Sequence, residues 1–172
     1  MEGAFAGPFL FAYLNEMNLR QAQPDDQPAI ALLLTAAFGQ PAEALLVESL
    51  RAEGAMALEL VVERRGNGLW GYLALSQMRS PVGWLALAPV AVAPSQQRQG
   101  VGSALILGAL EMTDAPVVVV GEPGYYARFG FSVDRAARLT SPYPPEFTAL
   151  HQRAPEGDAP AEVLVYATAF GS

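Results

Sequence analysis

The residue types and spacings with the most specific chemistry lie in residues 97–102, which read Gln-Arg-Gln-Gly-Val-Gly. An apolar, β-branched run ends at Pro94, and apolar residues recur at helical spacing after Gly100, so the pattern predicts a strand, a polar turn and a helix. Glycine places no side chain over the first backbone N–H groups of a helix, which have no partner within the helix. A phosphate group could therefore reach these donors and the positive end of the helix dipole.

Two other kinds of phosphate-binding loop also place glycines at the start of a helix. A Walker loop requires a lysine after its last glycine, and all 10 basic residues of the chain are arginines, so this alternative is excluded. A dinucleotide-binding fingerprint requires a third Gly or Ala three residues after the second glycine, where this chain has Leu105. Ordinary turn chemistry stays open as the alternative for an isolated Gly-x-Gly.

A second stretch with specific chemistry follows the next apolar run. Residues 117–120 are four valines, which suits a strand that is buried on both faces and parallel to its neighbour. Residues 121–124, Gly-Glu-Pro-Gly, end this strand at its carboxyl end, where ligands of parallel sheets usually bind. Residues 125–131, Tyr-Tyr-Ala-Arg-Phe-Gly-Phe, then predict a short helix that a glycine ends.

Together, the two stretches resemble the GNAT superfamily of acyl-coenzyme A N-acyltransferases. Residues 97–102 resemble its pyrophosphate loop, Gln/Arg-x-x-Gly-x-Gly/Ala, and residues 126–131 resemble its Tyr-x-x-x-Gly-Phe signature. Residues 121–131, Gly-x-Pro-x-Tyr-Tyr-x-Arg-Phe-Gly-Phe, are similar to those of a YhbS-like bacterial branch of acetyltransferases. The resemblance extends over residues 19–170 and is strongest over residues 87–131.

The resemblance implies transfer of an acetyl group from acetyl-CoA to a primary amine of an unidentified acceptor, without a metal. It assigns Tyr126 as the general acid that protonates the departing thiolate, and we expect Tyr125 to pack on the core. It assigns cofactor binding to the backbone of one strand and to the glycine loop. These residues are Val90, Ala91 and Val92 in the strand, and Gln97, Arg98, Gln99, Gly100, Val101, Gly102 and Ser103 in the loop.

The general base stays open. An aliphatic ammonium with a pKa of about 10.4 is neutral in only about one molecule in a few thousand at pH 7, a disadvantage of about 4 to 5 kcal/mol. Glu122 is the candidate nearest the strand end, with Glu43 and Glu48 on an earlier helix as alternatives. Many relatives place a glutamate in the strand at residues 84–92, which has no carboxylate here. A solvated helix charge, or a turn carboxylate paired with Arg128, is the structural alternative.

Composition excludes several other classes of protein. The chain has 172 residues, of which 52% are hydrophobic, enough for one core, and a net charge of −7, which disfavours a nucleic-acid surface. Cysteine is absent, so disulfides and thiolate catalysis are excluded, and the single histidine, His151, cannot build a histidine metal cluster. We expect a cytoplasmic protein, monomer or homodimer, whose partner is a small-molecule or peptide amine, with no nucleic acid and no membrane.

The elements that must position these residues follow from periodicity and turn signals. Asp26 as N-cap and Gly39 predict one helix, and Pro41 and Gly54 bound a second. Strands are expected at residues 19–22, 56–64, 69–78, 84–92 and 117–120, with a closing strand at 162–167. Residues 138–160 are rich in proline and are expected to form a loop that shapes an acceptor pocket or packs Phe147 and Leu150 on the core.

Pro89 falls inside the predicted strand at residues 84–92. Proline cannot donate to a strand ladder, so we expect a bulge or a splay from the next strand at this point. In the resembled superfamily, the fourth strand splays from the fifth and binds the pantetheine amides with its backbone. A proline at a sheet edge is the structural alternative.

The expected fold is α+β: a GNAT-like mixed, mostly antiparallel central sheet of about seven strands, with helices on both faces and a splay between strands 4 and 5. Residues 1–16 are interpreted as an N-terminal extension of uncertain order, and residues 17–172 as a single N-acetyltransferase domain. The alternative function is an acyl-CoA-binding sensor or regulatory module without turnover. A non-enzymatic interaction domain would need neither glycine loop nor tyrosine.

Overall fold

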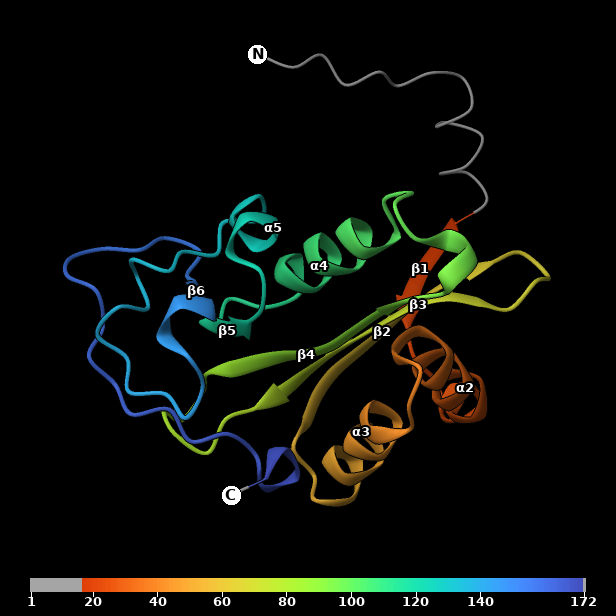
Figure 1. Ribbon diagram of the computed structural model, residues 1–172, viewed down its shortest axis with the longest axis horizontal. Helices are drawn as coiled ribbons and strands as arrows, with labels where there is room; N and C mark the ends of the chain where they lie inside the picture. Colours follow the sequence, from red (N-terminus) through yellow and green to blue (C-terminus); the bar gives the residue numbers. More distant parts are fainter. Residues whose placement is uncertain (1–16, 172) are drawn as a thin grey trace, which may run out of the picture.

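The computed structural model describes residues 17–171, so the predicted extension at residues 1–16 lies outside the described residues. Six strands form one sheet over this part of the chain, in the order β1-β2-β3-β4-β5-β6 (Figure 1). The strands are β1 (Met17–Gln21), β2 (Met56–Arg64), β3 (Leu69–Gln77), β4 (Leu85–Val92), β5 (Val117–Val120) and β6 (Thr148–His151). All neighbours are antiparallel except β4 and β5, which are parallel, and the predicted mixed sheet is confirmed.

The helices cover both faces of this sheet, as expected. They are α2 (Gln27–Phe38), α3 (Ala42–Ala52), α4 (Val101–Glu111) and α5 (Pro123–Ala127), with short 3-10 turns η1 (Pro24–Asp26), η2 (Pro94–Gln96), η3 (Pro145–Phe147) and η4 (Thr168–Phe170). Figure 1 shows α4 and α5 on one side of the sheet and α2 and α3 on the other. Because successive strand residues point to opposite faces, β3 supplies both cores: Leu73 and Leu75 pack beneath α4, and Tyr72 and Ala74 pack beneath α2.

The sheet forks between β4 and β5. The two strands pair only at Leu85 with Val117 and at Ala86 with Val118, so the rest of β4 has no neighbour on that side. On the other side of β4, the register with β3 shifts between Leu73 and Leu75, at the bulge that contains Pro89. The bulge and the splay that the proline predicts are both present.

The end of the sheet differs from the prediction. The sixth strand is β6, which pairs antiparallel with β5 and buries Leu150, whereas Phe147 is 42% exposed. Residues 162–167 do not form the predicted closing strand, because they make only isolated bridges, from Val163 to Thr140 and from Val165 to Ser80. Val163, Val165 and Tyr166 in a weakly alternating segment are typical of a strand, but the segment pairs with no continuous strand among the described residues.

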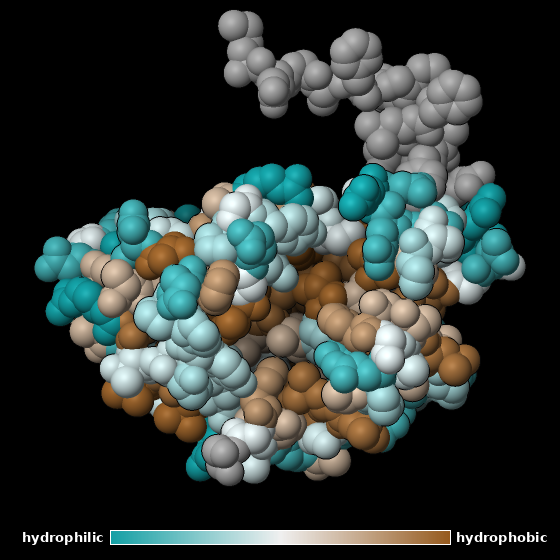
Figure 2. All heavy atoms as spheres, viewed as in Figure 1, coloured by the Kyte–Doolittle hydropathy of each residue, from teal (hydrophilic) through white to brown (hydrophobic). Residues whose placement is uncertain are grey.

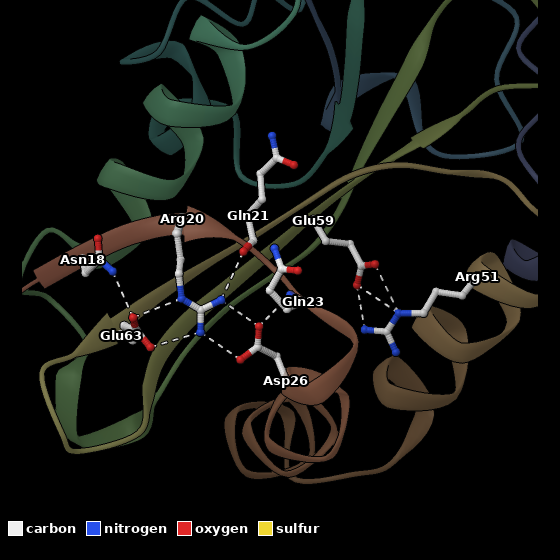
Figure 3. A network of polar contacts seen from close by, with 8 residues as sticks. All are labelled: Asn18, Arg20, Gln21, Gln23, Asp26, Arg51, Glu59 and Glu63. Atoms are coloured by element: carbon white, nitrogen blue, oxygen red, sulfur yellow. Dashed lines mark hydrogen bonds and ion pairs between the residues drawn. The ribbon is translucent and has the colours of Figure 1, made fainter.

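Two polar networks fix α2 and α3 to the sheet (Figure 3). Arg20 on β1 donates two hydrogen bonds to the Asp26 carboxylate, at 2.7 and 2.8 Å, and also pairs with Glu63 on β2. Asp26 therefore does not cap α2 with its side chain as predicted; it accepts instead from Arg20 and from the N–H of Gln23. The Arg20 guanidinium lowers the pKa of Asp26 to about 2.

The second network joins α3 to two strands. Arg51 on α3 contacts the Glu59 carboxylate at 2.6 Å, and the Tyr72 hydroxyl donates to the same carboxylate at 2.7 Å. Burial is the main cause that raises the pKa of Tyr72 well above its usual value. Helix α3 packs on the sheet through Val47 and Leu50, which are buried, whereas Leu45 is exposed.

Candidate active site

A cavity of about 580 Å³ lies between β4, α4 and α5. It is lined by Val90, Val92, Gln97, Arg98, Gly100, Val101, Gly102, Ser103, Tyr125, Tyr126 and Arg128. The fold thus brings together the two stretches that the sequence singled out, although more than twenty residues separate them. In the space-filling view, hydrophobic side chains surround a hollow in the middle of this face, below α4 and α5 (Figure 2).

The glycine loop carries a run of free backbone donors. Within the described residues, the N–H groups of residues 97–103 make no hydrogen bond, and the first bond of the helix runs from the Ala104 N–H to the Gly100 carbonyl at 3.0 Å. Gly100 adopts the left-handed conformation at φ +85°, and Arg98 does so at +64°. These turns gather the donors at the start of α4, where the helix dipole also favours an anion.

Gly102 and Tyr125 lie against each other across the cavity. A Cβ atom added at Gly102 would lie 2.9 Å from the Tyr125 hydroxyl oxygen and 3.6 Å from a methyl group of Val92. Only a residue without a side chain therefore leaves the Tyr125 ring and the loop backbone this close. Tyr125 packs against the core as expected, and it also lines the cavity.

The unpaired edge of β4 faces the same cavity. The Ala93 N–H donates to the Trp70 carbonyl on β3 at 2.8 Å, and backbone groups of successive strand residues point to opposite edges. Val90 and Val92 therefore direct their backbone groups away from β3, and the Val92 carbonyl accepts a hydrogen bond from the Gln97 side chain at 3.3 Å. Ala91 is different: it does not line the cavity, and its side chain is buried beneath α2.

Tyr126 is held by aromatic packing deeper in the site. Its ring makes edge contacts with Tyr125, at 5.0 Å between centroids, and with Phe131, at 5.7 Å, and it lies directly against Gly121. Burial, and to a smaller degree the neighbouring Tyr125, raises the pKa of the Tyr126 phenol above its ordinary value. Both effects favour the protonated phenol, which has a proton to donate.

Arg128 is a site residue that the sequence reasoning assigned no binding role. Its guanidinium lies 4.7 Å from the centre of the Tyr125 ring, and its Nε donates to the Tyr125 carbonyl at 3.3 Å. With Arg98, it gives the cavity two cations and no anion among the lining residues. Arg128 follows Tyr126 by two residues, and this position within the tyrosine signature could have identified it as a cavity residue from the sequence.

The three candidate bases lie outside this cavity. Glu122 is exposed at the start of α5, where its carbonyl accepts from the N–H groups of Tyr125 and Tyr126 at 3.1 and 3.2 Å. Among the described residues it forms no ion pair with Arg128. Glu43 accepts a hydrogen bond from Gln40, and Glu48 is exposed on α3. Gln99 is also exposed and does not line the cavity.

This fork, glycine loop and tyrosine helix agree with the family comparison. A family model described as the Acetyltransferase (GNAT) family matches residues 28–131, more than half of the chain. The chain belongs to the GNAT family of acetyltransferases.

Individual relatives are similar over most of the chain. The uncharacterized N-acetyltransferase YhbS of Escherichia coli is 35% identical over 124 residues, which cover 68% of this chain and 74% of the relative. The crystal structure of E. coli YhbS in complex with CoA matches with a TM-score of 0.79 at 29% identity, over 91% of this chain and 93% of that one. A GNAT family acetyltransferase from Brucella melitensis in complex with acetyl-CoA matches with a TM-score of 0.74 at 30% identity, over 90% and 97%.

The described residues contain neither a group of metal ligands nor a membrane-spanning helix. In residues 17–171, His, Asp and Glu side chains do not gather in any group of three or more that could hold a metal ion. Over the same part of the chain, each helix is too short or too polar to span a membrane.

Proposed function

We propose that this chain transfers the acetyl group of acetyl-CoA directly to a primary amine, and that residues 17–172 form one catalytic domain. The observation that carries the proposal is the run of unbonded backbone N–H groups at residues 97–103, placed beside the open edge of β4. Family membership and the CoA and acetyl-CoA complexes of the two similar structures support the same cofactor.

The residues of the cavity fit coenzyme A from its phosphates to its thiol. The N–H groups of the glycine loop and the guanidinium groups of Arg98 and Arg128 suit the pyrophosphate and the phosphate next to it, because charge-assisted hydrogen bonds are the strong ones. The backbone groups of Val90 and Val92, which point away from β3, suit the two amides of the pantetheine arm. Ala91 takes no direct part in this proposal, since its side chain is buried on the far face.

The acetyl thioester supplies the carbonyl carbon that the amine attacks. A C–N bond forms, the C–S bond breaks, and the amine loses one proton while the departing thiolate gains one. Tyr126 is the group placed to give the thiolate its proton, since its phenol lines the cavity and is held by Phe131 and Gly121. The phenol is regained in the neutral form when solvent or the proton released by the amine restores it.

Removal of the amine proton requires a base, and no carboxylate of the described residues lines the cavity. Glu122 is the carboxylate closest in sequence to Tyr126, and we propose that it accepts this proton through water, because it is exposed and does not line the cavity itself. The acceptor is a small-molecule or peptide amine.

The test is Tyr126→Phe, with Tyr125→Phe as its matched control. Thiol release from acetyl-CoA is followed with a panel of amines that includes 2-phenylethylamine, n-butylamine, spermidine and a short peptide. We expect Tyr126→Phe to lower kcat by about 10² to 10⁴ with little change in CoA affinity or melting temperature, because only the hydroxyl is lost. A loss confined to Tyr125→Phe would exchange the two roles.

Full activity in both variants would mean that the thiolate leaves without a tyrosine proton. CoA binding by the wild-type protein without thiol release for any amine of the panel would instead favour an acyl-CoA-binding module without turnover.

A further inference from the structure

A second cavity, of about 210 Å³, opens at the fork of the sheet. Its lining residues are Ala86, Leu87 and Ala88 of β4, Val118 and Val120 of β5, and the aromatic residues Tyr143, Tyr166 and Phe170. Ala86 and Val118 pack with Tyr166, whereas their strand neighbours Leu87 and Val117 pack beneath α4. Because strand side chains alternate between faces, this cavity meets the fork from the face opposite α4.

The aromatic wall comes from the segments that follow α5, most of which lie at the β5–β6 end of the sheet, while the last turn, η4, lies beside α3 (Figure 1). The Tyr143 and Tyr166 rings stand edge to face at 5.0 Å, and the Tyr166 and Phe170 rings at 5.5 Å. The Ala169 N–H donates to the carboxylate of Glu53, the residue that follows α3, at 3.1 Å, which fixes the neighbouring Phe170 against the body of the protein. The wall is therefore held in place by the fold.

This side of the fork carries almost no charge. A larger cavity of about 600 Å³ shares the same three aromatic residues, and Arg79 is its single charged lining residue. Among the described residues, neither cavity is lined by an aspartate or a glutamate, although the chain as a whole has a net charge of −7. A second ammonium group on an acceptor would find no counterion here and would meet Arg79.

An apolar wall also favours the reactive form of an amine. Loss of solvent disfavours the charged ammonium and so favours the neutral amine that attacks a thioester. The Tyr166 hydroxyl is buried here and makes no well-formed hydrogen bond among the described residues. Burial raises the pKa of this phenol, and the nearby Ser141 hydroxyl offsets part of that rise. One polar group of a bound molecule could pair with this hydroxyl.

We infer that the acceptor is a monoamine with an aromatic body, and that Tyr143, Tyr166 and Phe170 bind its ring at the fork while its amino group reaches the opposite side. The inference rests on the proposed function, because the fork is where the acetyl group would be delivered. The inferred acceptor is therefore of the arylalkylamine type, and polyamines and other polycations are disfavoured. An aromatic ring packed against three aromatic residues is stabilised both by burial of its apolar surface and by edge-to-face contacts.

The experiment compares three probe amines in the acetyl-CoA assay: 2-phenylethylamine, n-butylamine and spermidine. We expect kcat/KM for 2-phenylethylamine to exceed that of each other amine at least about tenfold, since a single methylene in a hydrophobic pocket already discriminates roughly 10- to 200-fold. Phe170→Ala should lower kcat/KM for 2-phenylethylamine roughly 10- to 100-fold through KM, and that for n-butylamine by less than about threefold. The matched control is Phe147→Ala, which removes an equally large ring that lines neither cavity.

Equal or higher kcat/KM for spermidine would overturn the inference, and so would a Phe170→Ala variant that keeps the wild-type ratio between the amines. CoA affinity, measured by calorimetry, separates the two levels of the argument. If CoA does not bind the wild-type protein, the proposed function fails. In that case, or if no amine turns over, saturation-transfer NMR with 2-phenylethylamine decides: a signal lost in Phe170→Ala and kept in Phe147→Ala supports the aromatic site, and no signal in the wild type overturns it.

Discussion

Gly102 is the position where a single added side chain tests the cofactor loop most directly. A Cβ atom there would lie 2.9 Å from the Tyr125 hydroxyl oxygen and 3.6 Å from Val92. Alanine requires the end of the Tyr125 side chain to move by a few tenths of an ångström, whereas valine also covers the N–H of residue 102 and of its neighbour. Neither change strains the backbone, because Gly102 lies in the first turn of α4 and is not among the glycines with positive φ.

The size of the effect follows from the number of donors lost. A hydrogen bond to a charged group contributes about 1.5 to 3 kcal/mol, so two blocked bonds correspond to about 3 to 6 kcal/mol. We therefore expect Gly102→Val to weaken CoA binding by about two orders of magnitude or more, at about 1.4 kcal/mol per tenfold. Gly102→Ala should lose about tenfold or less, while the helix gains up to about 1 kcal/mol from the better propensity of alanine.

Calorimetric titration with CoA measures these affinities, and thermal unfolding shows whether each variant is folded. Gly124→Ala is the matched control, because its Cβ atom would meet nothing within 4 Å and it also lies in a helix beside the site. Its CoA affinity should equal that of the wild-type protein. A folded Gly102→Val variant that binds CoA as tightly as the wild type would refute the assignment of the loop.

Three further predictions concern the base and the two polar networks. Glu122→Gln should shift the pH–rate profile toward higher pH once an acceptor is known, and a profile that only scales would leave Glu122 a structural role. Asp26→Asn should lower the free energy of unfolding at pH 7 by about 1 kcal/mol, given partial solvent exposure. Because the pKa of Asp26 falls from 3.8 to about 2 in the folded state, this difference should disappear as the pH falls through that range, and a difference that persists at about pH 2 would contradict the ion pair as its cause. Tyr72→Phe should destabilise the fold by about 1 to 2 kcal/mol in chemical denaturation, without changing CoA affinity, since the lost hydroxyl donates to the buried Glu59 pair far from the cavity.

The parts of the fold that sequence reasoning predicted well are governed by local signals. Turn glycines and strand periodicity predicted β2 to its end residues and β3, β4 and α4 to within one residue. The position of Pro89 predicted the bulge, because a missing N–H limits where proline can stand in a ladder. The glycine loop and the Tyr-x-x-x-Gly-Phe signature predicted most of the residues that line the cavity. Each is a short stretch whose backbone conformation requires particular residue types, so it can be recognised locally.

The features that sequence reasoning missed depend on contacts between distant segments. Whether residues 148–151 or residues 162–167 complete the sheet is decided by which of them reaches the free edge of β5, and neither segment encodes that choice locally. Contacts of the same kind join α3 to the sheet, since Arg51 pairs with Glu59 on β2 and the Tyr72 hydroxyl on β3 donates to the same carboxylate. Asp26 was also mispredicted because of a contact with another segment: its carboxylate accepts hydrogen bonds from Arg20 on β1 and does not cap α2.

The two sides of the fork therefore differ in how they are specified. On the cofactor side, the local sequence of residues 97–103 and of residues 121–131 specifies the conformation of each segment, and β5 links α4 to the second segment. On the other side, Tyr143, Tyr166 and Phe170 lie in irregular segments, and they meet because isolated bridges and the Glu53 hydrogen bond hold those segments on the sheet. Substitutions in these segments change the wall of the second cavity without touching the glycine loop or Tyr126. If the second cavity binds the acceptor, as inferred above, its aromatic residues rather than the two motifs determine which amine this chain accepts.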